Sequence, residues 1–102
     1  MLMLPARIII LSFVYDYPKI VVTAYSDTFG FEQTFLADLA NDDSCRDAIQ
    51  KINDYVMSIF ENLDRDSTTG CIYSALEQRF NRIRAFADIF GKGRDKEIFI
   101  PC

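Results

Sequence analysis

The regular patterning of the chain begins with a segment, residues 7–15, that is hydrophobic on both alternating faces. From Ile8 to Tyr15 the side chains are β-branched, aliphatic or aromatic, and Ser12 alone interrupts them. These residue types favour β-strands, and a strand with two apolar faces is typical of one buried on both sides. The pattern predicts a strand over Arg7–Tyr15 that needs a covering layer on each face.

Two further strands are predicted by the residues that follow. Asp16-Tyr17-Pro18-Lys19 has the composition of a turn, and Ile20–Tyr25 forms a second apolar segment. After another turn at Ser26–Gly30, residues Phe31–Leu36 alternate between apolar and polar side chains. The three segments together predict an antiparallel meander.

The hydrophobic period changes to that of a helix from Ser44 onwards. Ser44, with Asp47 three residues later, is typical of a helix N-terminus, and apolar residues at helical spacing continue to Leu63. The polar segment Asp64–Gly70 then predicts an interruption between this helix and the next.

A second helix is predicted over Cys71–Phe90, followed by a short strand. Gly91 predicts a glycine C-cap for this helix, and the apolar residues of Glu97–Pro101 predict the strand. The buried stripe of the helix is expected to contain Ile72, Leu76, Phe80, Ile83, Ala87 and Phe90.

The order of the predicted elements is β-β-β-α-α-β, which indicates an α+β fold in a single domain spanning residues 1–102. We expect a three-stranded antiparallel meander, then an antiparallel helix pair packed on one sheet face, then the short C-terminal strand. Because two helices cover one face, the doubly apolar first strand leaves a second face open. The N-terminal Met-Leu segment, a twin subunit or a foreign partner would cover it; we favour a twin subunit and expect a homodimer.

The absence of histidine excludes several kinds of catalytic site. Without imidazole the chain has no Ser-His-Asp triad, no Cys-His pair and no histidine-ligated metal. Its three cysteines show neither a CxxC motif nor a metal-binding spacing. We therefore expect no enzymatic activity, no metal and no cofactor. Cys45 and Cys71 are expected to be buried structural thiols, and Cys102 the most exposed of the three.

Cysteine usage and the N-terminal residues also predict where the protein acts. An odd number of cysteines without a paired framework is typical of reduced, intracellular proteins. The apolar run before Asp16 lacks a leading cluster of positive charge and a small-residue cleavage site, and it is too short to span a bilayer. We expect a cytoplasmic protein that does not contact membranes.

Charge is unevenly distributed along the chain, whose net charge is −4. Residues 1–66 carry eleven acids and five bases, whereas residues 67–102 carry four acids and six bases. Direct nucleic-acid binding is disfavoured, because phosphate affinity requires clustered cations, and Arg79, Arg82 and Arg84 would spread over about 200° of a helix. A protein partner with a basic surface suits the acidic first part of the chain better.

Four acidic residues line up on the exposed side of the first predicted helix. Asp47, Asp54 and Glu61 lie within about 40° of each other, and Asp43 points the same way just before the helix. Such a ridge is either a docking surface for a basic groove or an ordinary solvated face, and both interpretations stay open. Two aromatic residues that lie off the apolar stripes complete the candidate partner-binding set: Tyr17 and Tyr73.

In size, acidity and lack of catalytic groups, the chain resembles the small acidic proteins with which phages and mobile elements block host defence enzymes, anti-CRISPR proteins among them. The resemblance rests on this general profile and covers no motif. It implies a non-enzymatic inhibitor that binds a nucleic-acid-handling protein, with the acidic ridge in a phosphate-like role. Two alternatives stay open: a toxin-neutralising immunity protein, and a small assembly or adaptor subunit that oligomerises through its apolar first strand.

Overall fold

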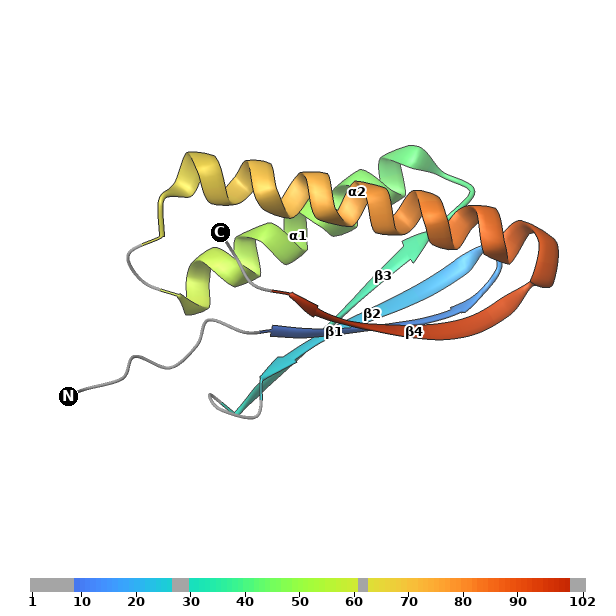
Figure 1. Ribbon diagram of the computed structural model, residues 1–102, viewed down its shortest axis with the longest axis horizontal. Helices are drawn as coiled ribbons and strands as arrows, with labels where there is room; N and C mark the ends of the chain where they lie inside the picture. Colours follow the sequence, from blue (N-terminus) through green and yellow to red (C-terminus); the bar gives the residue numbers. More distant parts are fainter. Residues whose placement is uncertain (1–8, 27–29, 61–62, 100–102) are drawn as a thin grey trace.

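A computed structural model, which describes residues 9–26, 30–60 and 63–99, confirms the predicted α+β order β-β-β-α-α-β. The four strands form one antiparallel sheet in the order β3-β2-β1-β4, so the predicted meander is also confirmed. Both helices lie on one face of this sheet (Figure 1). The elements are β1 (Ile9–Asp16), β2 (Lys19–Ser26), β3 (Phe31–Asp38), α1 (Asp42–Ile59), α2 (Arg65–Phe90) and β4 (Lys92–Phe99).

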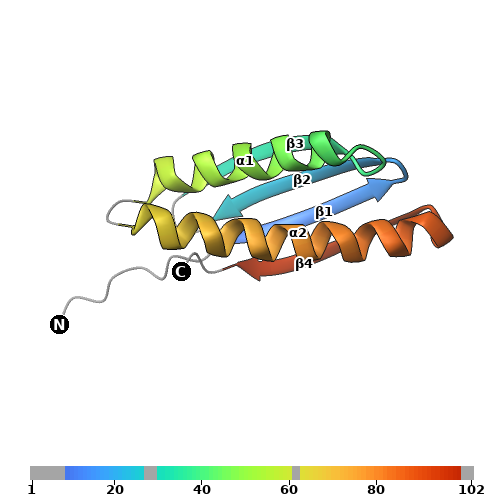
Figure 2. The same cartoon turned by 90° about the horizontal axis from the view of Figure 1, so that it is seen from above.

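The face of the sheet beneath the helices forms the hydrophobic core. Alternate residues of β1, namely Ile9, Leu11 and Phe13, are completely buried there. The Phe13 ring meets Phe80 of α2 edge to face, with 6.4 Å between the ring centroids. Viewed from above, α1 lies over the β3 side of the sheet and α2 over the β4 side (Figure 2). The two helices thus divide one sheet face between them.

Helix α1 begins two residues earlier than the sequence predicts, because Asn41 caps it. The Asn41 side chain accepts hydrogen bonds from the backbone N–H groups of Asp43 and Ser44. The predicted capping role of Ser44 is therefore wrong; its hydroxyl instead accepts a hydrogen bond from the Asp38 N–H at the end of β3. This bond joins the last strand of the meander to the first turn of α1.

Helix α2 also begins earlier than predicted, at Arg65 instead of Cys71. Asp64 caps it by accepting a hydrogen bond from the Ser67 N–H, so the polar segment read as an interruption is mostly the first turns of the helix. Serine, threonine and glycine are poor helix formers, so residues 67–70 did not predict the first turns of α2. The predicted glycine C-cap is confirmed: Gly91 ends the helix with φ of 84°, a conformation that favours glycine.

Strand β4 is much longer than the predicted strand at Glu97–Pro101. It starts at Lys92, directly after the helix cap, and pairs with β1 over its whole length, from Lys92 opposite Asp16 to Phe99 opposite Ile9. Its residues 92–97 are charged apart from Gly93. A charged sequence of this kind does not predict a strand, although charged side chains are common on strands at the edge of a sheet. The last three residues of the chain lie outside the described part.

Arg79 attaches α2 to the inner side of β4. Its guanidinium donates to Asp95 at 2.6 Å and to Glu97 at 3.1 Å, and it lies 5.8 Å from the centre of the Phe13 ring. The side chain is only 15% exposed. The two carboxylates on the helix side of β4 are therefore paired inside the fold, and hydrogen bonding to Glu97 raises the pKa of Arg79.

The second face of the sheet has no covering layer among the described residues. Three of its apolar side chains are largely open to solvent: Val14 is 45% exposed, Ile98 68% and Leu36 72%. The sequence predicted that this face needs a cover, and neither helix supplies it. Residues 1–8, which include the Met-Leu segment and the start of the predicted first strand, lie outside the described part.

The cysteines differ from the expectation of reduced thiols. Cys45 is buried and free, as predicted, and it is not joined to Cys71. Cys71, in contrast, is disulfide-bonded, so the expectation of a reduced thiol is wrong there. The exposure predicted for Cys102 concerns a residue outside the described part.

Within residues 9–26, 30–60 and 63–99, no helix is long and apolar enough to cross a membrane.

Candidate functional site

The acidic residues predicted on the first helix lie along the solvent side of α1. Asp43, Asp47 and Asp54 are all exposed, while the opposite side of the helix buries Ile52 and Val56 in the core. Asp43 is part of the helix, since α1 begins at Asp42. The fourth predicted member, Glu61, lies outside the described residues.

Two of these carboxylates are paired with cations of the same helix. Arg46 contacts Asp43 at 2.7 Å, and Lys51 contacts Asp47 at 2.9 Å. The Asp43 carboxylate raises the pKa of Arg46 by hydrogen bonding. All four side chains are more than 60% exposed, so solvent screening keeps both pairs weak. The negative charge of Asp43 and Asp47 is therefore partly offset by cations of the same helix.

A hollow of about 440 Å³ lies beside this ridge, between α1 and the edge strand β3. It is apolar at Leu36, which is 72% exposed, and acidic at Asp54. Burial raises the pKa of Tyr55, so its phenol keeps its proton at neutral pH. We call this region the acidic α1 surface; it comprises Asp43, Asp47, Asp54 and the residues of the hollow, Gln33, Thr34, Phe35, Leu36, Lys51 and Tyr55.

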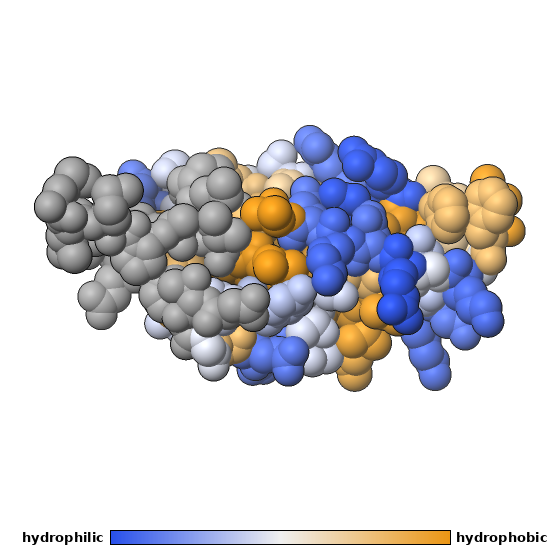
Figure 3. All heavy atoms as spheres, turned by 60° about the horizontal axis from the view of Figure 1, so that its bottom comes forward, coloured by the Kyte–Doolittle hydropathy of each residue, from blue (hydrophilic) through white to orange (hydrophobic). Residues whose placement is uncertain are grey.

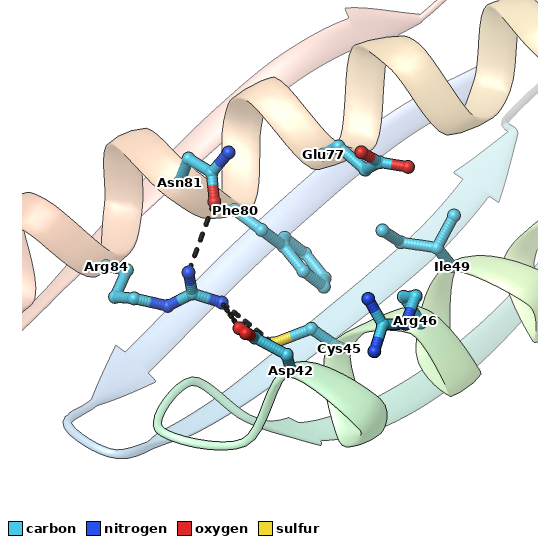
Figure 4. Close-up of a pocket in the computed structure, with 8 residues that line it drawn as sticks. All are labelled: Asp42, Cys45, Arg46, Ile49, Glu77, Phe80, Asn81 and Arg84. Carbon is cyan, nitrogen blue, oxygen red and sulfur yellow. Dashed lines mark hydrogen bonds and ion pairs between the residues drawn. The ribbon is translucent and has the colours of Figure 1, made fainter.

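A second hollow, of about 260 Å³, lies between the two helices and is shown in Figure 4. Arg84 points into it and donates to the Leu39 carbonyl at 2.7 Å and to Asn81 at 3.2 Å. The same guanidinium lies 3.2 Å from Asp42 and 3.6 Å from the Cys45 sulfur. Because its donors are engaged by the protein, Arg84 fastens the start of α1 to α2 and has little capacity left for a ligand.

The aromatic residues predicted as contacts occupy a different environment from the acidic ones. Tyr17 and Tyr73 are half-buried and pack against the core, and their role in binding stays a prediction. Among the described residues, two exposed aromatic side chains are Phe86 at 46% and Phe90 at 65%, whose tilted rings have centroids 4.6 Å apart. The burial predicted for Phe90 is wrong, because the last turn of α2 carries its apolar stripe into solvent.

The uncovered sheet face carries a basic stripe that the sequence analysis missed. Lys92, Arg94 and Lys96 alternate along β4 and all are exposed on that side. Within the described ranges, no carboxylate lies within ion-pair distance of these three cations. The basic residues at every second position from Lys92 onwards could have predicted this stripe. They were missed because the strand was predicted to begin only at Glu97.

Two surfaces of this protein are therefore candidates for binding: the acidic α1 surface and the uncovered sheet face. They meet at the edge strand β3, whose Thr34 and Leu36 belong to both surfaces. Figure 3 turns the uncovered side of the sheet toward the reader, with hydrophilic and hydrophobic patches next to each other. The described residues contain no group of three or more histidine, cysteine or acidic side chains placed to hold a metal ion. No protein-family model, curated protein or solved structure matches the chain.

Proposed function

We propose that this chain is a non-enzymatic protein-binding module that docks its acidic α1 surface on a basic surface of a partner protein. The observation that carries the proposal is the exposure of Asp43, Asp47 and Asp54 along α1, together with an open hollow that Asp54 lines. The carboxylates provide charge complementarity, and the apolar hollow provides area from which water is excluded on binding. We propose an inhibitory role, in which this surface occupies a groove that otherwise holds nucleic acid.

The ion pairs within α1 do not prevent such binding. A partner cation displaces Lys51 or Arg46 at little cost, because solvent screens exposed ion pairs within a helix. Asp54 has no ion-pair partner among the described residues and is the strongest single contact that α1 offers. Binding of this kind weakens with salt, since the screening length falls from about 10 Å at 0.1 M to about 3 Å at 1 M.

Two charge-matched variants test the proposal. The first carries Asp47→Asn and Asp54→Asn on the acidic α1 surface, and the control carries Asp66→Asn and Asp88→Asn at exposed positions of α2. Fluorescence anisotropy with an arginine-rich peptide as the probe gives the Kd of each protein. We expect binding at least about tenfold weaker for the first variant and little change for the control. Equal weakening in both variants would show that only net charge matters and would contradict the proposal.

A second candidate function, a small assembly subunit, is favoured by the uncovered sheet face. Exposed apolar side chains such as Val14 and Ile98 on one continuous face are typical of surfaces that meet another protein. Such a subunit forms oligomers whose stability does not depend on Asp47 or Asp54. Sedimentation of the wild type and of the Asp47→Asn, Asp54→Asn variant tests this function, which requires an oligomer of equal stability in both proteins.

A further inference from the structure

The uncovered face of the sheet consists of four rows of side chains that run across the strands in the order β3, β2, β1, β4. The strand register places directly opposite residues on the same face. One outer row is fully charged, with signs that alternate across the sheet: Asp38, Lys19, Asp16 and Lys92. The next row is apolar and ends in a cation: Leu36, Val21, Val14 and Arg94.

The other two rows are mixed in character. One carries hydroxyl groups and a cation: Thr34, Thr23, Ser12 and Lys96. The last is largely apolar, with an acid at its β3 end: Glu32, Tyr25, Ile10 and Ile98. Acidic groups therefore mark the β3 edge of this face, and three cations mark the β4 edge.

This arrangement is complementary to itself under one specific rotation. A two-fold axis parallel to the strands, lying between two facing sheets, places the β3 edge of one copy opposite the β4 edge of the other. In the charged row, Asp38 then faces Lys92 and Lys19 faces Asp16, so that each of the four charges meets an opposite one. In the apolar row, Val21 faces Val14, and the aliphatic stem of Arg94 covers the exposed Leu36.

The alternative two-fold axis, perpendicular to the strands, does not give this match. It lays each strand on its own copy, so that Arg94 of one chain meets Lys96 of the other across the interface. Like charges in such contacts disfavour association. Of these two axes, the charge pattern therefore favours the one parallel to the strands, although it places Glu32 opposite Ile98 in the last row.

The charged row and the apolar row border a hollow in the uncovered face. A hollow of about 410 Å³ lies over Val14 and Val21 and is rimmed by Asp16, Lys19 and Lys92. Facing sheets pack about 10 Å apart, a separation that lysine and aspartate side chains bridge together. The charged row therefore lies close enough to its symmetry mate for ion pairs at the rim of an apolar contact.

The area of the face sets the strength of the interface. Four strands of eight residues span roughly 27 by 19 Å, or about 500 Å² per copy, from the usual rise and strand spacing. Two such faces together reach about 1,000 Å², the lower limit for a specific interface. The expected dimer is thus weak, with a Kd on the order of micromolar and a marked dependence on salt.

We infer that the uncovered sheet face binds a second copy of this chain, in a dimer whose two-fold axis runs parallel to the strands and whose charged rows pair with each other. The inference is argued separately from the proposed function: the dimer leaves both α1 helices on its outer sides, and the two surfaces share only Thr34 and Leu36 of β3. It supplies the missing layer over β1 that the sequence pattern requires.

Charge-reversal variants that restore each other test this geometry. In Asp38→Lys homodimers the introduced lysine faces Lys92, and in Lys92→Asp homodimers the introduced aspartate faces Asp38, so both variants repel their own copies. In a mixed dimer of the two variants every facing pair is opposite in charge. Sedimentation equilibrium of the full chain should show a dimer for the wild type, at least about 100-fold weaker association for each variant, and recovery when they are mixed.

A second pair keeps the test independent of any effect on folding. Asp38 accepts a hydrogen bond from the Ala40 N–H at 2.8 Å, so its replacement disturbs the β3–α1 turn. Asp16 and Lys19 are both exposed. The Asp16→Lys and Lys19→Asp variants each place like charges opposite each other in their own dimers, and mixing them should restore association. Circular dichroism checks that each variant is folded. A wild-type protein that stays monomeric at about 1 mM, or mixtures no more associated than their components, would overturn the inference.

Discussion

The two faces of the sheet are built from the same four strands, yet their neighbouring residues have different roles. On β1, Phe13 is completely buried beneath the helices, whereas the next residue, Val14, is 45% exposed on the other side. The pleat sends successive side chains to opposite faces, so one step along the strand separates a core position from a surface position. The difference shows that apolar character alone does not identify the core of this protein.

Strand β4 shows the same separation with charged residues. Asp95 and Glu97 point toward α2, where Arg79 pairs with both, whereas Arg94 and Lys96 point toward solvent on the uncovered side. The charged side chains that β4 presents on its open face are therefore all cations, although acids and bases are nearly balanced along the strand. Pairing the acids internally leaves the bases available for contacts outside the chain.

The largest difference between the two faces is expected for truncation of adjacent residues of β1. Phe13→Ala removes a fully buried ring and should lower the free energy of unfolding by about 3–5 kcal/mol. Val14→Ala should lower it by less than about 1 kcal/mol at high salt and low protein concentration, where the chain is monomeric. Urea unfolding measures both. Similar losses would mean that the open face is covered within the monomer.

A smaller difference is expected for the cations on the two sides of β4. Arg79→Met leaves Asp95 and Glu97 without their partner; since they are 40% and 29% exposed, solvent limits the loss of stability to about 1–3 kcal/mol. Lys96→Met, on the open face, should change stability by no more than about 0.5 kcal/mol. Thermal unfolding of both variants checks this, and equal effects would contradict the assignment of Arg79 as the link to α2.

Replacing two glycines by alanine compares a tightly packed position with an open one. A Cβ added at Gly93 would lie 2.7 Å from the Tyr15 hydroxyl oxygen, so Gly93→Ala should cost about 1–2 kcal/mol. A Cβ at Gly70 in α2 meets nothing within 4 Å, and Gly70→Ala should stabilise the protein by about 0.5–1 kcal/mol. Opposite signs in urea unfolding are the expected result; destabilisation by both changes would show that α2 does not begin before residue 70.

The smallest effect concerns pH. Burial raises the pKa of Tyr55 above the model-compound value of 10.0, so the folded protein holds this proton more tightly than the unfolded chain. Its contribution to stability is present below pH 10 and is lost as the pH rises through the raised pKa. Unfolding of wild type and Tyr55→Phe at pH 9 and pH 11 tests this, because the variant should lose less stability than the wild type on that change.

The strands and helices were predictable where the residue pattern is distinct, as in the continuous apolar run of β1 and the helical spacing of α1. The start of α2 and the length of β4 were not, because capping by Asp64 and pairing of a charged edge strand depend on contacts with other segments. The exposed side of α1 followed from helical geometry, whereas its pairing with Arg46 and Lys51 required the side-chain conformations. The four-row pattern needs the strand register, which no local sequence signal provides.

Cross-linking between isotopically distinct copies tests most directly whether the uncovered face is an interface between two chains. A mixture of ¹⁴N and ¹⁵N protein is treated with a carbodiimide, which joins a lysine amine to a carboxylate in direct contact, and the products are identified by mass spectrometry. Lys92 and Asp38 lie on opposite edges of one sheet, about 14 Å apart, so a link between them joins two chains. We predict that this link forms in mixed-isotope pairs. Mixed-isotope links only between α1 carboxylates and β4 lysines, or links only between neighbours in one chain such as Asp16 and Lys92, would contradict the two-fold dimer.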